Sequence, residues 1–354
     1  MSDIQHSCIE LLPDEIFLDI FSYFYFDELF PPWVNLNSRI NHILRSTRSK
    51  LFISSNSDLK KKARKVNYPS KWSDTVICFT DYREDHENYV TSTIPMDLRP
   101  LVNLRRLSLK YCSWGQYSNI CSANFPYLKR LDIGDYETPF SFWERILFKD
   151  NPFPFLTTIT GVQLEKDENF QMDKTTNTMI QHVGFSHQLK LPFAPFITFI
   201  SRLPNLISLR ANVAEFTRAV PPPQITTKIR HMSIFLQQKT TLDEIEFLVQ
   251  ISPIKRLYLE IGSEGYWYGP ESKLCDFVRL AKILNNCQTL VEVEVVGWYF
   301  NGHVNIPEVC QLSQWFTQLH IGTGYQDRKS LQTPTTSRQR KFVCKPPFNE
   351  HFRY

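Results

Sequence analysis

The sequence has few glycines, 11 among 354 residues, and it lacks several patterns that define common enzyme and membrane classes. It contains no Gly-rich phosphate-binding loop, no Gly-x-Ser-x-Gly turn and no His-Glu-x-x-His pair. No segment reaches the roughly 18 apolar residues of a membrane span, and the first residues lack the basic-then-apolar layout of a signal peptide. These absences predict a protein that is not an enzyme and has no membrane segment.

Paired cysteines are also missing. The eight cysteines form no C-x-x-C pair and the chain has no N-x-[ST] sequon, which agrees with reduced thiols in the cytoplasm, the nucleus or both. His182 and His187 are five residues apart, but no cysteine or carboxylate is spaced to complete a metal site with them. We therefore predict no metal and no cofactor.

The chain is rich in aromatic residues and has the overall composition of a globular protein. It has 27 Phe and 15 Tyr, with 42% hydrophobic and 21% charged residues, as globular proteins have. At about 100 to 200 residues per domain, the length allows two domains or one long repeat array. The net charge of +4 neither demands nor excludes an acidic partner.

A dense apolar helix is predicted close to the first residue. Pro13 suits the first helical position, and Asp14 and Glu15 place negative charge at the positive end of the helix dipole. Helical spacing then gives one apolar stripe, formed by Ile16, Phe17, Ile20, Phe21 and Phe24.

A second helical element follows after Asp27, with Asn37 and Ser38 able to cap a break in it. Its apolar positions keep the three-to-four spacing and are Trp33, Leu36, Ile40, Ile43 and Leu44. Roughly 35 residues are too few to fold comfortably alone, so the apolar surface of these helices is expected to need a partner.

These residues resemble the F-box, the short helical module that docks on the Skp-family adaptor of cullin-RING ubiquitin ligases. The likeness covers about residues 9 to 50, from Leu12-Pro13-Asp14-Glu15-Ile16 through Asp27-Glu28-Leu29. It implies binding to a Skp-family adaptor and a cullin, with adaptor contacts at Leu12, Pro13, Ile16, Ile20, Leu29, Leu36 and Ile40. The sequence departs from the family pattern at Pro31-Pro32, which interrupts the second helix, and at Ile40, where the family often has Trp.

The rest of the chain contains an internal repeat. "LVNLRRLSLKYC" has the L-x-x-L-x-L-x-x-C arrangement of a leucine-rich repeat, from Leu104 to Cys112. Looser copies follow at steps of 24, 28, 24, 26, 23, 25, 36 and 26 residues. We call the first apolar position of each copy its marker residue; the markers are Leu104, Leu128, Leu156, Ile180, Leu206, Ile229, Ile254, Leu290 and Phe316. The weakest copies are those at 156, 180 and 316.

Helices are predicted between the strands. "TLDEIEFLVQ" carries a Thr241-x-x-Glu244 capping box, and "SKLCDFVRLAKIL" repeats the design from Ser272. After Cys112 the family's Asn or Cys position is filled by other residues, namely Tyr136, Gln237, Gly262 and Trp298. The predicted fold class is α/β: a short all-α F-box-like module followed by an irregular leucine-rich-repeat solenoid, or horseshoe. The alternative is an α/β domain whose strands happen to fall about 25 residues apart.

In such repeats, strand residues that alternate with the buried ones line the concave surface. The early copies place basic residues there, Arg106, Lys110 and Arg130. The later copies place Tyr258, Glu260, Glu292 and Glu294. We expect these residues to bind a protein target, because a basic-to-acidic gradient suits a partner with its own charge asymmetry. Ordinary solvated strand faces are the alternative.

Two basic stretches complete the expected organisation. Residues 51–70 are expected to be a linker and residues 326–354 a polar tail that is ordered only locally, on either side of a solenoid at 71–325. Nucleic-acid binding is disfavoured because aromatic residues are not interleaved with the basic ones in the tail. The function we expect is target recruitment to a Skp-cullin-F-box ligase. The alternative is a protein-binding scaffold with a degenerate F-box.

Overall fold

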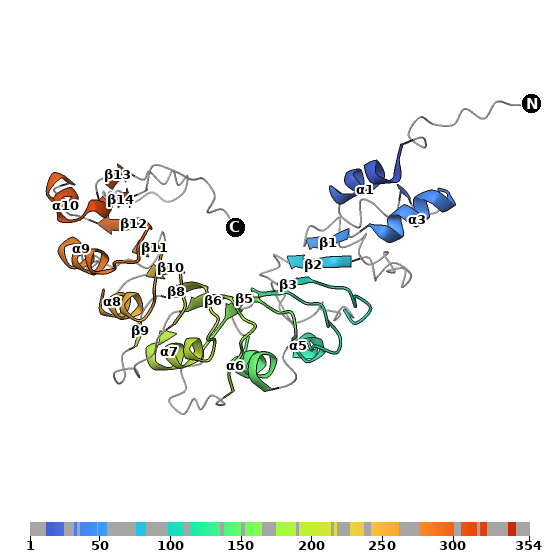
Figure 1. Ribbon diagram of the computed structural model, residues 1–354, viewed down its shortest axis with the longest axis horizontal. Coiled ribbons are helices and arrows are strands. Elements are labelled where there is room, and N and C mark those ends of the chain that lie inside the picture. Colours follow the sequence, from blue (N-terminus) through green and yellow to red (C-terminus); the bar gives the residue numbers. More distant parts are fainter. Residues whose placement is uncertain are drawn as a thin grey trace, which may run out of the picture. The chain divides into compact units, whose positions relative to one another are not determined.

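The chain is mixed α/β, with parallel β-strands and helices between them (Figure 1). It divides into two compact units, Met1–Gly161 and Val162–Tyr354. The structure is a computed structural model, and it describes residues 12–24, 32–33, 36–47, 49–54, 76–82, 98–109, 114–134, 138–149, 153–164, 175–188, 191–213, 216–217, 227–236, 242–261, 276–300, 306–316, 319–323 and 339–344.

The first unit begins with the two predicted helices. Helix α1 (Asp14–Ser22) starts one residue after Pro13, which is its N-cap. Helix α3 (Ser38–Ser46) starts after Asn37, whose side-chain oxygen accepts a hydrogen bond from the Ile40 amide at 2.7 Å. The predicted cap is therefore confirmed. Each helix buries one apolar face, made of Phe17 and Phe21 in α1 and of Ile40, Ile43 and Leu44 in α3.

A parallel sheet follows these helices in the same unit. Its strands lie in chain order: β1 (Ser49–Ser54), β2 (Val76–Tyr82), β3 (Arg106–Leu109), β4 (Arg130–Ile133) and β5 (Thr158–Val162). Helices α5 (Trp114–Asn119) and α6 (Phe140–Glu144) precede β4 and β5, and α6 continues into a π-helical turn, η3 (Arg145–Lys149). Figure 1 shows α5 and α6 on one side of these strands.

The expected linker at 51–70 needs a correction, because residues 51–54 belong to β1 and pair with β2. Neither β1 nor β2 was predicted. Residues 55–70 lie outside the described residues.

The second unit has a parallel sheet of β6 (His182–Gln188), β8 (Ser208–Val213), β10 (His231–Leu236), β11 (Arg256–Ile261) and β12 (Glu292–Phe300). A separate short pair joins β7 (Leu191–Pro192) and β9 (Phe216–Thr217). The helices are α7 (Phe193–Ser201), α8 (Leu242–Gln250), α9 (Phe277–Asn286), α10 (Ile306–Leu312) and the 3₁₀ turn η4 (Gln314–Phe316). Figure 1 shows α7, α8 and α9 along one side of the strands.

The C-terminal region departs from the parallel order of the preceding strands. The copy at Phe316 leads into β13 (Leu319–Thr323), but β13 does not pair with β12. Strand β14 (Gln339–Cys344) lies between them and runs antiparallel to both, so the parallel order ends at β12. Because β14 comes from residues 326–354, part of the expected tail belongs to the sheet.

The helix expected to start from Ser272 also differs. Helix α9 begins at Phe277 and its N-cap is Asp276, whose carboxylate accepts the Arg279 amide at 2.9 Å. Ser272 and Thr241, the two predicted caps, lie outside the described residues. Helix α8 is confirmed over the predicted stretch.

Every marker residue is buried, with 0 to 8% of its surface exposed. Backbone hydrogen bonds give the strands a recurring start. The Arg105 carbonyl accepts the amides of Lys129 and Arg130 at 2.7 and 3.0 Å, and the Arg230 carbonyl accepts those of Lys255 and Arg256 at 2.8 and 3.0 Å. These neighbouring strands thus start in register, so alternate residues of β3 and β4, and of β10 and β11, line up in rows on one face.

Gly161 in β5 occupies a position that only glycine fits. Its φ of +88° lies in the left-handed region, and a Cβ built there would lie 1.6 Å from the Ile133 carbonyl oxygen. An atom cannot approach backbone that closely, so any side chain at 161 would force β4 and β5 apart.

Candidate functional site

The N-terminal helices hold together through a small core of their own. Trp33 contacts the rings of Phe17 and Phe21 edge-on, with centroids 6.4 and 5.1 Å apart. Arg39 of α3 ties the helices together, because its Nε donates to Asp14 Oδ1 at 2.8 Å and its Nη2 donates to the Leu12 carbonyl. The same guanidinium lies 5.7 Å from the centre of the Phe17 ring. We call residues 12–47 the helical module.

The helical module leaves large apolar side chains uncovered. Ile16 is 43% exposed, Leu36 is 59% exposed, and Pro13 is also exposed. Tyr23 at 86% and Phe24 at 39% add to this set, although the sequence did not mark them as adaptor contacts. Tyr23 is the C-cap of α1 and follows Ile16 by seven residues, so the two lie on the same side of the helix.

The remaining predicted adaptor residues differ in accessibility. Leu12 and Ile20 are half-buried, and Leu29 lies outside the described residues. Ile40 is only 3% exposed and belongs to the core of the helical module. The burial of Ile40 therefore argues against its predicted role as an adaptor contact.

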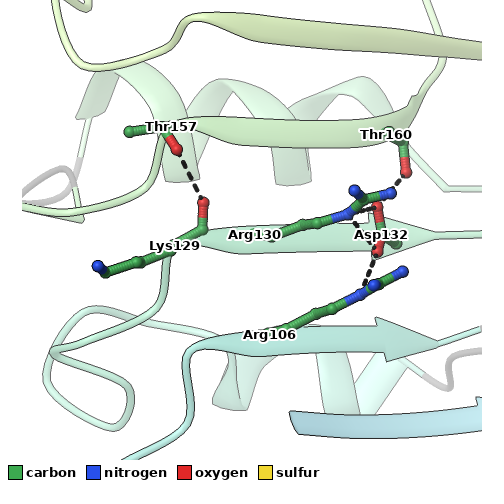
Figure 2. Close-up of polar contacts among 6 residues, drawn as sticks. All are labelled: Arg106, Lys129, Arg130, Asp132, Thr157 and Thr160. Atoms are coloured by element: carbon green, nitrogen blue, oxygen red, sulfur yellow. Dashed lines mark hydrogen bonds and ion pairs between the residues drawn. The ribbon is translucent and has the colours of Figure 1, made fainter. Parts of the chain in front are cut away.

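In the first unit, the polar face of the sheet is organised around Asp132. Figure 2 shows Arg106 and Arg130 reaching the same carboxylate from neighbouring strands. The Arg106 Nε donates to Asp132 Oδ2 at 3.2 Å, the Arg130 Nε donates to both carboxylate oxygens at 2.9 Å, and Thr160 Oγ1 donates to Oδ1 at 2.6 Å. Asp132 itself is only 9% exposed. We call these four residues the Asp132 cluster.

Strand register explains the Asp132 cluster. Arg106 is the register partner of Arg130, and Asp132 is that of Thr160. Asp132 follows Arg130 by two residues and therefore points to the same face. The sequence marked both arginines but missed Asp132, so it overstated the positive charge of this face. Lys110, the third predicted basic residue, lies outside the described residues.

In the second unit, aromatic and acidic side chains occupy the same sheet face. The Tyr258 hydroxyl donates to Glu260 at 2.8 Å, and its ring lies 5.3 Å from that of Phe235. The Arg210 guanidinium stacks over Phe235 at 5.0 Å from the ring centre. Burial, and after it the hydrogen bond to Glu260, raise the pKa of Tyr258 well above its ordinary value, so its hydroxyl remains a donor.

Carboxylates outnumber cations on β11 and β12. Arg256 pairs with Glu292 at 3.2 Å, while Glu260 and Glu294 add two further negative charges to the face. His231 lies on the adjacent strand, in register with Arg256. Burial first, and then the charge of Arg256, lower the pKa of His231, which keeps its imidazole neutral at pH 7. Within β11 and β12, this face therefore carries the three carboxylates of Glu260, Glu292 and Glu294 and one arginine, Arg256.

A cavity of about 490 Å³ opens beside α8 and α9, lined in part by Glu246, Cys287 and Thr289. Two of its hydroxyl groups, those of Thr227 and Ser252, already bond each other at 2.6 Å.

Within the described ranges, no cluster of three side chains could hold a metal ion, and none of the helices there is long and apolar enough to cross a membrane. No family model matches this sequence, and a comparison with curated proteins finds no match. The residues described above are therefore the basis for inferring a function.

Proposed function

We propose that this chain recruits substrates to a Skp-cullin-F-box E3 ubiquitin ligase. In this proposal the N-terminal F-box-like module binds the Skp-family adaptor, and the polar sheet face binds the target protein. The observation that carries the proposal is the exposure of Ile16, Phe24 and Leu36 in the helical module, whose two helices already bury a core of their own. Large apolar side chains that a domain leaves exposed together commonly mark a protein-interaction site.

The leucine-rich-repeat part of the proposal is supported by the buried marker residues and by the recurring strand starts. Each copy supplies one short strand that is buried only when neighbouring copies stack on it. The α/β arrangement is compatible with an irregular repeat, and the antiparallel β14 would close its C-terminal end. In a solenoid of this kind, the polar rows on the strands would form the recruiting surface.

The chain would contribute no catalytic group of its own to ubiquitin transfer. Other subunits of the ligase would deliver ubiquitin, while this chain holds the target near them. Raising the local concentration of a reactant is itself a large source of rate. By the family resemblance, the complex would act in the cytoplasm, the nucleus or both.

The second candidate function is a protein-binding scaffold that engages no ligase. Two observations favour it: Pro31-Pro32 lies between α1 and α3, and Ile40 is buried where the F-box resemblance expected a contact. Under this alternative the sheet face would bind its partner in the same way, but the exposed residues of the helical module would not bind the adaptor.

Capture of purified Skp-family adaptor by the full chain distinguishes the ligase subunit from the scaffold. Ile16→Asp with Leu36→Asp should abolish capture, because central apolar anchors lose about 2 kcal/mol or more each when removed from an interface. The matched control is Val278→Asp on α9, a residue that is 66% exposed. That variant should bind the adaptor like the unaltered chain. No capture by any of the three folded proteins would favour the scaffold, whereas equal capture by all three would show that the adaptor does not bind through Ile16 and Leu36.

A further inference from the structure

Both arginines of the Asp132 cluster contact the carboxylate through Nε. The Arg106 Nε lies 3.2 Å and the Arg130 Nε 2.9 Å from Asp132. Within the part of the chain that the structure describes, neither guanidinium has another hydrogen-bond or ion-pair partner. Their terminal nitrogens, which carry four of the five donor hydrogens of each arginine, are therefore left for a ligand.

The positions of these donors are set in advance. Arg106 and Arg130 are register partners on adjacent strands, about 4.8 Å apart in a sheet. Figure 2 shows the two side chains running along their strands in the same direction and converging on Asp132. Their side chains remain 47% and 37% exposed. A ligand would thus meet two oriented guanidinium groups without having to order them first.

The charge of the cluster selects the ligand. Two arginines and one aspartate leave one net positive charge, which a single carboxylate would neutralise. A phosphate group, at about −1.5 to −2, would exceed that charge and would lie beside the carboxylate of Asp132. The planar fork of arginine also matches the two oxygens of a carboxylate.

We propose that the Asp132 cluster is a carboxylate-binding site that reads an aspartate or glutamate side chain of a protein partner. Asp132 is a positioning residue, which aims the two guanidinium groups and lowers their joint charge to one. That the partner is a ligase target rests on the proposed function above. The binding of the carboxylate does not require the adaptor.

Fluorescence anisotropy of labelled peptides with the full chain tests this site directly. The probes are hexaglutamate, hexaglutamine and a hexapeptide of phosphoserine. Hexaglutamate should bind at least about tenfold more tightly than hexaglutamine, as expected when a charged acceptor replaces a neutral one. It should also bind no more weakly than the phosphoserine peptide.

The variants separate the site from general electrostatic attraction. Arg106→Gln with Arg130→Gln should weaken hexaglutamate binding by about tenfold or more. Lys129→Gln removes one charge beside Arg130, but Figure 2 shows this side chain pointing away from Asp132, so its effect should stay under about twofold. The double variant leaves the buried Asp132 carboxylate without its two arginine partners, so it can be replaced by a triple variant that also carries Asp132→Asn. The triple variant has no unpaired carboxylate at position 132 and serves for the test if the double variant does not fold.

Three results would overturn the proposal: hexaglutamate binding that survives in the folded triple variant, an equal loss in Lys129→Gln, or tighter binding of the phosphoserine peptide. The last would identify the site as one for dianions. Adaptor capture measured on the same proteins distinguishes this inference from the proposed function. Peptide binding without adaptor capture would support the carboxylate-binding site and contradict the ligase proposal. Adaptor capture without peptide binding would support the ligase proposal and contradict the carboxylate-binding site.

Discussion

The helical module and the repeated strands bury their apolar residues to different extents. Every marker residue of the repeats is at most 8% exposed, whereas Ile16 and Leu36 of the helical module are 43% and 59% exposed. The marker residues are thus covered by the chain itself. In the module, by contrast, the structure describes only two short helices in full. These helices bury Phe17 and Phe21 between them, but the outer faces of the helices remain uncovered. Binding of the adaptor, as proposed above, would cover the exposed side chains of the module.

The largest expected effect tests how tightly the repeated strands pack. Gly161→Ala would place a methyl group against the Ile133 carbonyl and require a left-handed backbone, so we expect a loss of about 4 kcal/mol in the free energy of unfolding. Urea denaturation measures the loss. The control is Thr158→Ala on the same strand, which should cost less than about 1 kcal/mol. A loss as small as that of the control would show that β4 and β5 are not held this closely.

A second pair of substitutions compares neighbouring residues. Leu128 is fully buried, and Leu128→Ala should cost about 3 kcal/mol because it leaves a cavity. Tyr127 is 50% exposed and its ring stacks on Phe155 at 6.3 Å, so Tyr127→Ala should cost about 1 kcal/mol or less. Denaturation by urea reports both values. If the two losses were equal, or in the opposite order, the repeat register would be wrong.

The smallest effect concerns the helical module. Arg39→Ala removes the pair with Asp14, the bond to the Leu12 carbonyl and the contact with the Phe17 ring, together worth about 1 kcal/mol. Faster hydrogen exchange in α1 and α3, measured by mass spectrometry, should reveal it. His42→Ala, at an exposed position of the same helix, should leave exchange unchanged. Similar exchange in both variants would mean that Arg39 does not join the helices.

Local pattern was enough to place much of this fold. The marker residues were found because an apolar residue recurs about every 25 positions, and α1, α3 and α8 because their apolar residues keep helical spacing. Strands β2 and β14 were missed for a physical reason. "VICFTDY" lacks the leucine spacing of the other copies, and "QRKFVC" lies in a basic polar stretch whose pairing with β12 is a contact between distant residues.

The candidate sites, too, could be predicted from the sequence only in part. Alternation along β3 and β4 placed Arg106 and Arg130 on the polar face, but periodicity does not say that both would turn toward Asp132. That depends on strand register and on side-chain rotamers. Likewise, helical spacing put Ile40 and Leu36 on one stripe, although only Leu36 remains accessible once α3 packs against α1.

The affinity of the full, unaltered chain for purified Skp-family adaptor tests the central claim most directly. Isothermal titration calorimetry should detect a complex with a Kd of about 1 μM or below, a binding free energy of about −8 kcal/mol. The unaltered chain is a demanding test because of Pro31-Pro32 and the buried Ile40. A chain that unfolds cooperatively in urea, yet shows no binding at tens of micromolar adaptor, would contradict the ligase proposal and leave the scaffold in its place.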